Sequence, residues 1–339
     1  MKKFSCAAFL FALALVILTA CGNGANERAG TGDADTGRAL RVVTTIFPEY
    51  DWVRQILGDK ANDADLTLLL DNGVDLHSYQ PTVEDMVKIS SCDLFIYVGG
   101  ESDEWVKDAL SEAVNQDMTV INLLDALGDA AKEEEVVEGM QESEHGDEEG
   151  EEAEYDEHVW LSLKNARILC GVIADALIAL SPDDAQTFAD NLNAYQARLD
   201  ELDAQYQSAV SEAPVKTLLF GDRFPFRYLT DDYGLNYYAA FVGCSAETEA
   251  SFETVVFLAN KVDELNLSSV LTIENSDGKI ARTIVENTAA KSAQILRMDS
   301  MQSATSGDVS NGATYLGVME RNLEVLRDAL KLRKEGGTP

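Results

Sequence analysis

The stretch SPDDAQTFADNLNAYQARLDELDAQYQSAVSEAP, residues 181–214, has the pattern of one long amphipathic helix. Ser181 before Pro182 predicts its start, because a serine side chain accepts N–H groups of the first turn and proline fits the first helical position. The apolar residues that follow recur at spacings of three and four and so share one helix face: Phe188, Leu192, Tyr195, Leu199, Leu202, Tyr206 and Val210. A helix of about 30 residues is about 45 Å long, which exceeds one small lobe. We therefore expect it to bridge two lobes; a coiled coil is the alternative, which the lack of further heptads disfavours.

Short β-rich runs alternate with amphipathic segments on both sides of this helix, as is typical of parallel α/β layers. Before it, strands are predicted at 41–46, 66–70, 93–98 and 120–123, and helices at 48–57, 83–90 and 164–179. After it, strands are predicted at 216–220, 236–241, 269–273 and 293–297, and a last helix at 313–331. The predicted fold class is α/β, with two similar parallel-sheet lobes joined by one long rigid helix.

The start of the chain predicts export and a lipid anchor. A short basic start precedes an apolar run at 9–18 that is too short to span a bilayer, which indicates a signal peptide. The run ends in Leu18-Thr19-Ala20-Cys21, which resembles the lipobox of bacterial lipoproteins, with Cys21 as the site of lipid attachment. A plain secretory signal with an incidental cysteine is the alternative.

These features divide the chain into five predicted parts. They are a lipoprotein signal peptide at 1–20, a flexible tether at 21–38, an N-terminal α/β lobe at 39–180, the linking helix at 181–213 and a C-terminal α/β lobe at 214–334. Within the first lobe, residues 130–157 are densely acidic and carry His145. Repulsion between like charges predicts a mobile acidic loop there, serving either as a solubilising insert or as a collector of cations.

The charge balance excludes some partners. With 60 Asp and Glu against 26 Lys and Arg, the formal net charge of −34 would repel nucleic acids and anionic membrane surfaces, so cations are the natural ligand class. Once Cys6 is removed and Cys21 is lipidated, Cys92, Cys170 and Cys244 remain. This odd number cannot form a complete disulfide framework.

Two of the three histidines lie where a ligand is expected. His77 follows the second predicted strand, and His158 begins the ordered chain after the acidic loop. In open α/β sheets, ligands bind beyond the carboxyl ends of the strands. Two such histidines in an exported acidic protein indicate a transition-metal site.

Five segments, taken together, resemble the zinc/manganese solute-binding proteins of ABC transporters, over a similarity that runs from about Arg41 to Leu332: Thr44–Val53, His77–Thr82, Val98–Trp105, His158–Leu161 and Asp231–Leu235. The resemblance implies that His77 and His158 are metal ligands from the first lobe. It also implies an extracytoplasmic, lipid-anchored monomer that delivers Zn²⁺, or alternatively Mn²⁺, to an ABC permease in the membrane. In that family, an acidic or His-rich loop ahead of the second histidine is typical of zinc importers, and the long helix limits lobe movement.

The sequence departs from this family in two places. Asp156-Glu157 and Ser162-Leu163 stand where the family has Asp-Pro, and Gly221 stands where it has the His or Glu ligand of the second lobe. Glycine has no side chain to coordinate a metal.

Other residues must therefore complete the second half of the site. Asp299 and Glu274 match acidic positions of the family, and the predicted metal ligands are His77, His158, Glu274 and Asp299. Asp222 and Cys244 are further candidates, and a thiolate ligand would argue against manganese.

Two other classes of function compete with solute binding. A metallohydrolase would need a catalytic set such as His-Glu-x-x-His, which the sequence lacks, so we do not expect an enzyme. A surface adhesin of the same fold is compatible with solute binding and stays open.

Overall fold

A computed structural model describes residues 38–141, 154–245 and 249–331. From Ala39 onward the chain forms one compact unit. The predicted signal peptide, the lipobox Cys21, nearly all of the tether and His145 lie outside the described residues. No helix among the described residues is long and apolar enough to cross a membrane.

The first half of this unit is built on a parallel four-stranded sheet in the order β2-β1-β3-β4. Its strands are β1 (Arg41–Thr44), β2 (Asp65–Leu68), β3 (Leu94–Tyr97) and β4 (Thr119–Asn122). Its helices are α1 (Phe47–Leu57), α2 (Val83–Ser91), α3 (Trp105–Ser111), α4 (Leu123–Leu127) and α5 (Leu163–Leu180). The central strands β1 and β3 are buried on both faces, as parallel strands between helix layers are.

The second half repeats this topology, with a parallel sheet in the order β6-β5-β7-β8. Its strands are β5 (Thr217–Phe224), β6 (Asn236–Val242), β7 (Ser269–Thr272) and β8 (Gln294–Arg297). Its helices are α7 (Arg227–Tyr233), α8 (Phe252–Glu264), α9 (Lys279–Asn287) and α11 (Tyr315–Ala329). The short helix α10 (Ser306–Ser310) comes from this part of the sequence but lies against the first half, where Ser306 N donates to the carbonyl of Asp71 at 2.6 Å. All eight predicted strands are confirmed, and the α/β class with two similar parallel sheets is confirmed with them.

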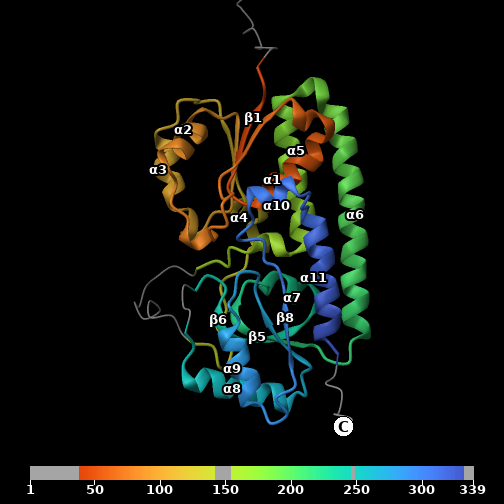
Figure 1. Ribbon diagram of the computed structural model, residues 1–339. Helices are drawn as coiled ribbons and strands as arrows, with labels where there is room; N and C mark the ends of the chain where they lie inside the picture. Colours follow the sequence, from red (N-terminus) through yellow and green to blue (C-terminus); the bar gives the residue numbers. More distant parts are fainter. Residues whose placement is uncertain (1–37, 142–153, 246–248, 332–339) are drawn as a thin grey trace, which may run out of the picture. The chain divides into compact units, whose positions relative to one another are not determined.

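The long helix α6 (Ala185–Glu212) runs beside helices from both halves, as Figure 1 shows for α11. Pro182 begins a short 3₁₀ turn, η6 (Pro182–Asp184), which leads into it. Near its start, Asn191 Nδ2 donates to the carbonyl of Ile56 in α1 at 2.9 Å. Further along, Tyr206 Oη donates to the carbonyl of Met319 in α11 at 2.7 Å. The helix therefore contacts both halves, as expected from its predicted length.

Part of the predicted acidic loop is packed rather than mobile. Glu133 forms an antiparallel bridge with Tyr155, and Gln141 N donates to the carbonyl of Ala240 in β6 at 3.0 Å. Met140 is buried. The described ends of this loop, at 130–141 and 154–157, thus have backbone groups that bond to each other and to the second half, while most of their acidic side chains face solvent.

Short polar turns end the strands and start the helices beyond them. Thr82 caps α2 by accepting from Asp85 N at 3.2 Å while the Asp85 carboxylate accepts from Thr82 N, a capping box. Asn122 and Ser162 cap α4 and α5 by accepting a backbone N–H with the side-chain oxygen alone. The cap of α4 fixes the point where β4 ends and its helix begins.

Candidate metal centre

His77 lies in a one-turn 3₁₀ helix, η2 (Leu76–Ser78), in the segment that follows β2. The Asp75 side chain caps this turn, with Oδ1 accepting from His77 N at 3.1 Å. On the ring, Nδ1 lies 2.8 Å from Ser102 Oγ and 3.3 Å from Glu157 Oε2. The His77 side chain is only 9 % exposed, and polar groups hold its Nδ1 edge.

His158 is fully buried and precedes a second short turn, η5 (Val159–Leu161). Its Nδ1 lies 2.9 Å from Asp156 Oδ1, which also accepts the His158 backbone N–H at 2.9 Å. Burial by itself lowers the pKa of His158, but the neighbouring carboxylates, Asp156 foremost, outweigh it, so the pKa lies above its usual value. The residue pair Asp156-Glu157, where this chain departs from the family, thus holds both histidines.

The hydrogen bond to Asp156 fixes the tautomer of His158, because a carboxylate only accepts and therefore receives a proton-bearing Nδ1. Glu157 Oε2 lies 3.3 Å from Nδ1 of His77. Burial raises the pKa of Glu157, but hydrogen bonds from His77 and Ser102 outweigh it and hold that pKa below its usual value. The Nε2 atoms of the two rings lie 3.2 Å apart.

Cys244 joins this pair from the second half of the chain, in the turn that follows β6. Ligand atoms of His77, His158 and Cys244 all lie within 4.8 Å of one another, and they form the one group of three or more potential metal ligands in the described residues. Burial, and then the charges of Glu134 and other nearby carboxylates, raise the pKa of the Cys244 thiol well above its usual value. Glu134 Oε1 accepts from Cys244 N at 3.1 Å and so fixes the turn.

Gly243 allows this close approach. A Cβ atom at position 243 would lie 2.9 Å from His158 Cε1 and 3.0 Å from its Nδ1. Real Cβ atoms do not approach a ring so closely without displacing it, so a side chain here would push the buried His158 ring away. Glycine before Cys244 is therefore a requirement of the site.

Glu274 and Asp299, predicted as ligands, follow β7 and β8 and are partly exposed. Glu274 accepts from Ser300 N at 2.8 Å and from Gln302 N at 3.1 Å, using both carboxylate oxygens. Asp299 Oδ1 accepts from Met301 N at 2.9 Å. Burial raises the pKa of both carboxyl groups. They shape the turn after β8, and they are not members of the group formed by His77, His158 and Cys244 among the described residues.

Two positions of β5, Gly221 and Asp222, do not belong to this group of potential ligands among the described residues. A Cβ atom at position 221 would lie 2.6 Å from Ala281 Cα in α9, so the second sheet packs too tightly for any side chain there. Asp222 Oδ1 accepts from Arg223 N at 2.9 Å, within its own turn. The missing ligand at position 221 thus reflects close packing of strand on helix, and Cys244 lies where the second half meets the histidines.

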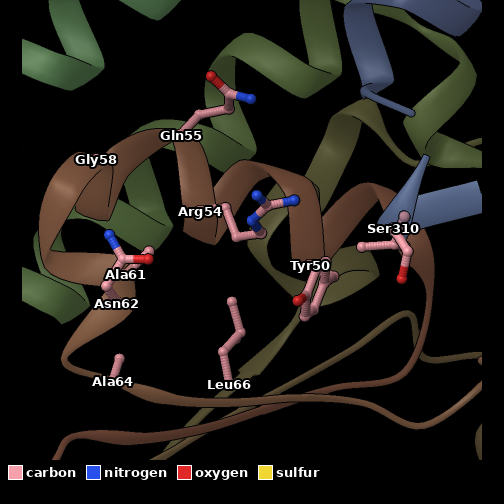
Figure 2. A pocket seen from close by; sticks show the side chains of 10 residues that line it. Tyr50, Arg54, Gln55, Gly58, Ala61, Asn62, Ala64, Leu66 and Ser310 are labelled. Atoms are coloured by element: carbon pink, nitrogen blue, oxygen red, sulfur yellow. The ribbon is translucent and has the colours of Figure 1, made fainter. Parts of the chain in front are cut away.

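A separate hollow of about 680 Å³ opens between α1, η1 (Gly58–Asn62), β2 and α10 (Figure 2). Its polar lining includes Tyr50, Arg54, Gln55, Asn62 and Ser310. Among the described residues that line it there is no His, Cys, Asp or Glu, so it offers none of the side chains that bind transition metals best.

The chain is similar to zinc-binding and zinc-uptake proteins of Streptococcus and Bacillus. It is 32% identical over 331 residues to zinc-binding lipoprotein AdcA of Streptococcus pneumoniae, which covers 96% of this chain and 61% of AdcA. It is 28% identical over 336 residues to high-affinity zinc uptake system protein ZnuA of Bacillus subtilis, covering 98% and 99%. The chain spans 55% to 61% of the length of the AdcA proteins that it matches.

The fold has solved counterparts. The Zn(II)-bound ZnuA-like domain of S. pneumoniae AdcA matches with a TM-score of 0.66 at 29% identity, over 86% of this chain and 99% of that domain. Metal-dependent lipoprotein YcdH of B. subtilis matches with a TM-score of 0.67 at 26% identity, over 86% and 99%. The model of the family described as zinc-uptake complex component A periplasmic matches residues 42–329, so the chain belongs to the ZnuA family.

Proposed function

We propose that this chain captures one zinc ion outside the cytoplasm and delivers it to the membrane permease of an ABC importer. Membership of the ZnuA family supports this function, as do the names of its zinc-binding relatives. The observation that carries it is the gathering of His77, His158 and Cys244, with ligand atoms within 4.8 Å of one another. Two imidazoles and a thiol are ligands that zinc prefers.

The geometry of the two imidazoles fits one tetrahedral ion. Two nitrogens bound to zinc at about 2.0–2.1 Å lie about 3.3 to 3.4 Å apart when the angle between the bonds is tetrahedral. The Nε2 atoms of His77 and His158 lie 3.2 Å apart. A thiolate at about 2.3 Å from the same ion lies about 3.6 Å from each nitrogen. Because the cluster atoms lie within 4.8 Å, binding needs only a small movement of the Cys244 turn.

The donor set favours zinc over manganese. Manganese(II) prefers oxygen ligands, whereas thiolate and imidazole suit zinc. The high pKa of Cys244 means that its proton leaves only when a metal replaces it. A strongly Lewis-acidic ion such as Zn²⁺ drives that exchange better than Mn²⁺ does, so Cys244 is the residue that selects the metal.

A fourth ligand completes a tetrahedral site, and Asp299 and Glu274 are the candidates. Glu274 accepts hydrogen bonds on both oxygens, so it would have to release the turn after β8 in order to bind zinc. Asp299 accepts one, from Met301, on Oδ1. We therefore rank Asp299 ahead of Glu274.

Binding of zinc between two lobes would let the permease distinguish the loaded protein from the zinc-free one. We propose that residues 39–180 and 214–334 act as the lobes, joined by the helix at 181–213. Zinc bound by His77 and His158 on one side and Cys244 on the other would favour one lobe arrangement, because a ligand shifts the equilibrium toward the state that it binds better. The loaded protein would then differ from the zinc-free one at the surface that the permease contacts.

Location follows from the lipobox. We propose that Cys21 carries the lipid and that the chain works as an anchored monomer outside the cytoplasmic membrane. The lipoprotein name of its AdcA relative supports this. Cys21→Ala should release the protein into the soluble extracytoplasmic fraction. An unmodified N-terminus elsewhere, found by mass spectrometry, would refute the anchor.

The decisive variants are His77→Ala and His158→Ala, measured by zinc competition titration against a chromophoric chelator. Each removes one of the converging lone pairs, so each should weaken zinc affinity by at least a hundredfold, about 2.7 kcal/mol. His145→Ala is the matched control and should keep the tight site. Wild-type affinity in both His77→Ala and His158→Ala would refute the proposed function.

A further inference from the structure

We infer that Arg223 is a positioning residue that holds the two ligand-bearing turns of the zinc site together. Arg223 belongs to β5 in the second half of the chain. The register between β5 and β6 shifts between Phe220 and Arg223, an irregularity of the kind that turns side chains out of the regular alternation. This inference rests on the zinc-binding function proposed above.

The guanidinium of Arg223 reaches the turn that carries His77. Its Nη2 donates to Asp75 Oδ2 at 2.5 Å, and both side chains are largely buried, at 17 % and 18 % exposed. The other oxygen of the same carboxylate, Oδ1, accepts from His77 N. Asp75 therefore links the cation of the second half directly to the backbone of a metal ligand in the first.

The same guanidinium also contacts the turn that carries Cys244. Its Nη1 donates to the carbonyl of Ser245 at 3.4 Å, next in the chain to Cys244. The planar guanidinium of arginine offers several donors in a fixed fork, so it can hold two acceptors at once in one geometry. A lysine at this position has a single ammonium group, which can make only one of these two contacts in good geometry.

Because Arg223 is positively charged, the direction in which its removal changes zinc affinity tests this role. A positive side chain near a bound Zn²⁺ repels it, so electrostatics alone predicts that removing the charge strengthens zinc binding. A clamp predicts the opposite, because it holds the ligands in place before the metal arrives and so reduces the cost of ordering them. The two explanations therefore differ in direction as well as in size.

The experiment compares Arg223→Gln, Arg223→Lys and Asp75→Asn with wild type. The asparagine can still cap the His77 turn, because its side-chain oxygen accepts as that of aspartate does. Lys60→Gln is the matched control, since it removes one positive charge and one ion pair, with Asp184, in a different part of the first half. Zinc affinity is measured by chelator competition and zinc release by stopped flow, and thermal unfolding of the zinc-free proteins verifies folding.

We expect Arg223→Gln to weaken zinc affinity about tenfold, chiefly through faster release, and Arg223→Lys to recover part of the loss. Asp75→Asn should weaken affinity severalfold, and combining it with Arg223→Gln should add little, because both changes break one contact. Lys60→Gln should behave as wild type. A purely structural role would instead lower the unfolding temperature without changing zinc release.

Unchanged or tighter zinc binding in folded Arg223→Gln overturns the inference. If Arg223→Gln does not fold, wild-type release rates in both Arg223→Lys and Asp75→Asn overturn it equally. The proposed function fails separately: it falls if His158→Ala keeps wild-type affinity, whereas loss of binding in His158→Ala with normal binding in Arg223→Gln refutes the clamp alone.

Discussion

The Nε2 atoms of His77 and His158 lie 3.2 Å apart, although 81 positions separate the two residues in the chain. On the far sides of the rings, Nδ1 of His158 donates to Asp156, and Nδ1 of His77 lies 2.8 Å from Ser102 Oγ. Two lone pairs that face each other at this distance repel unless a proton or a cation lies between them. The buried polar groups thus hold the imidazoles in place for a metal.

Replacing Cys244 with serine should weaken zinc affinity by at least tenfold, about 1.4 kcal/mol. The reason is the loss of the one sulfur ligand, which zinc binds far better than a hydroxyl. Competition titrations with Zn²⁺ and Mn²⁺ should show a smaller preference for zinc in the variant. Cys92→Ala, which removes a buried free thiol elsewhere, serves as the control. Equal zinc affinity in Cys244→Ser and wild type would exclude the thiolate.

Asp299→Ala should weaken zinc affinity by at least tenfold if Asp299 supplies the fourth ligand. Glu274→Ala should lower the unfolding temperature of the zinc-free protein more than Asp299→Ala does, because Glu274 holds the turn after β8 with both oxygens. Differential scanning calorimetry and chelator competition separate the two effects. If neither substitution changes zinc affinity, the fourth position belongs to another ligand or to water.

Deletion of residues 142–153 should leave the tight zinc site intact, because the packed ends of the acidic segment stay in place.

Glu134→Ala, in contrast, should weaken zinc affinity by about three- to tenfold, since Glu134 fixes the Cys244 turn through Cys244 N. Glu133→Ala removes an equal charge from an exposed neighbour and is the control. Isothermal titration calorimetry measures zinc affinity in both variants. An equal loss of affinity in Glu134→Ala and Glu133→Ala would show that only the negative charge matters and not the contact with Cys244 N.

The zinc-free protein should lose stability as pH rises from about 5 to 8. Burial, and then the charge of Asp103, raise the pKa of Glu49 to about 8, and burial raises the pKa of Asp103 to about 7. The folded protein therefore keeps protons that the unfolded chain has released above pH 4.5, so the free energy of unfolding falls with pH throughout this window.

Glu49→Gln should flatten that decline, by up to about 1.4 kcal/mol per pH unit for the one proton involved. The glutamine oxygen can still accept from Thr45 N and Ile46 N, as Glu49 Oε2 does. Urea unfolding at several pH values measures the slope, with the exposed Glu253→Gln as control. An identical pH slope in Glu49→Gln and wild type would show that Glu49 ionises normally.

Much of the fold could be predicted because its signals are local. Apolar β-rich runs identified all eight strands, and the apolar stripe from Phe188 to Val210 identified α6. The packing of the acidic segment at its described ends could not be predicted, because charge density describes side chains whereas these contacts are made by the backbone. Gln141 N pairs with the carbonyl of Ala240, a contact that no local pattern encodes.

Of the proposed site, the histidines could be predicted and Cys244 could not, for a related reason. Histidines are rare in this chain, so His77 and His158 stood out, whereas a single cysteine is more often a buried apolar residue. One signal could have found Cys244: β2 and β6 hold equivalent positions in the two sheets, His77 follows β2, and Cys244 follows β6. The contact of Arg223 with Asp75 spans 148 positions and needed the structure.

X-ray absorption at the zinc K-edge of the zinc-loaded protein tests the central claim most directly, that His77, His158 and Cys244 bind one ion together. The account predicts one sulfur at about 2.3 Å and two imidazole nitrogens at about 2.0–2.1 Å, with a light atom completing four-coordination. In Cys244→Ser the sulfur shell should vanish while the imidazole signals remain. A wild-type spectrum with only nitrogen and oxygen neighbours would contradict the account.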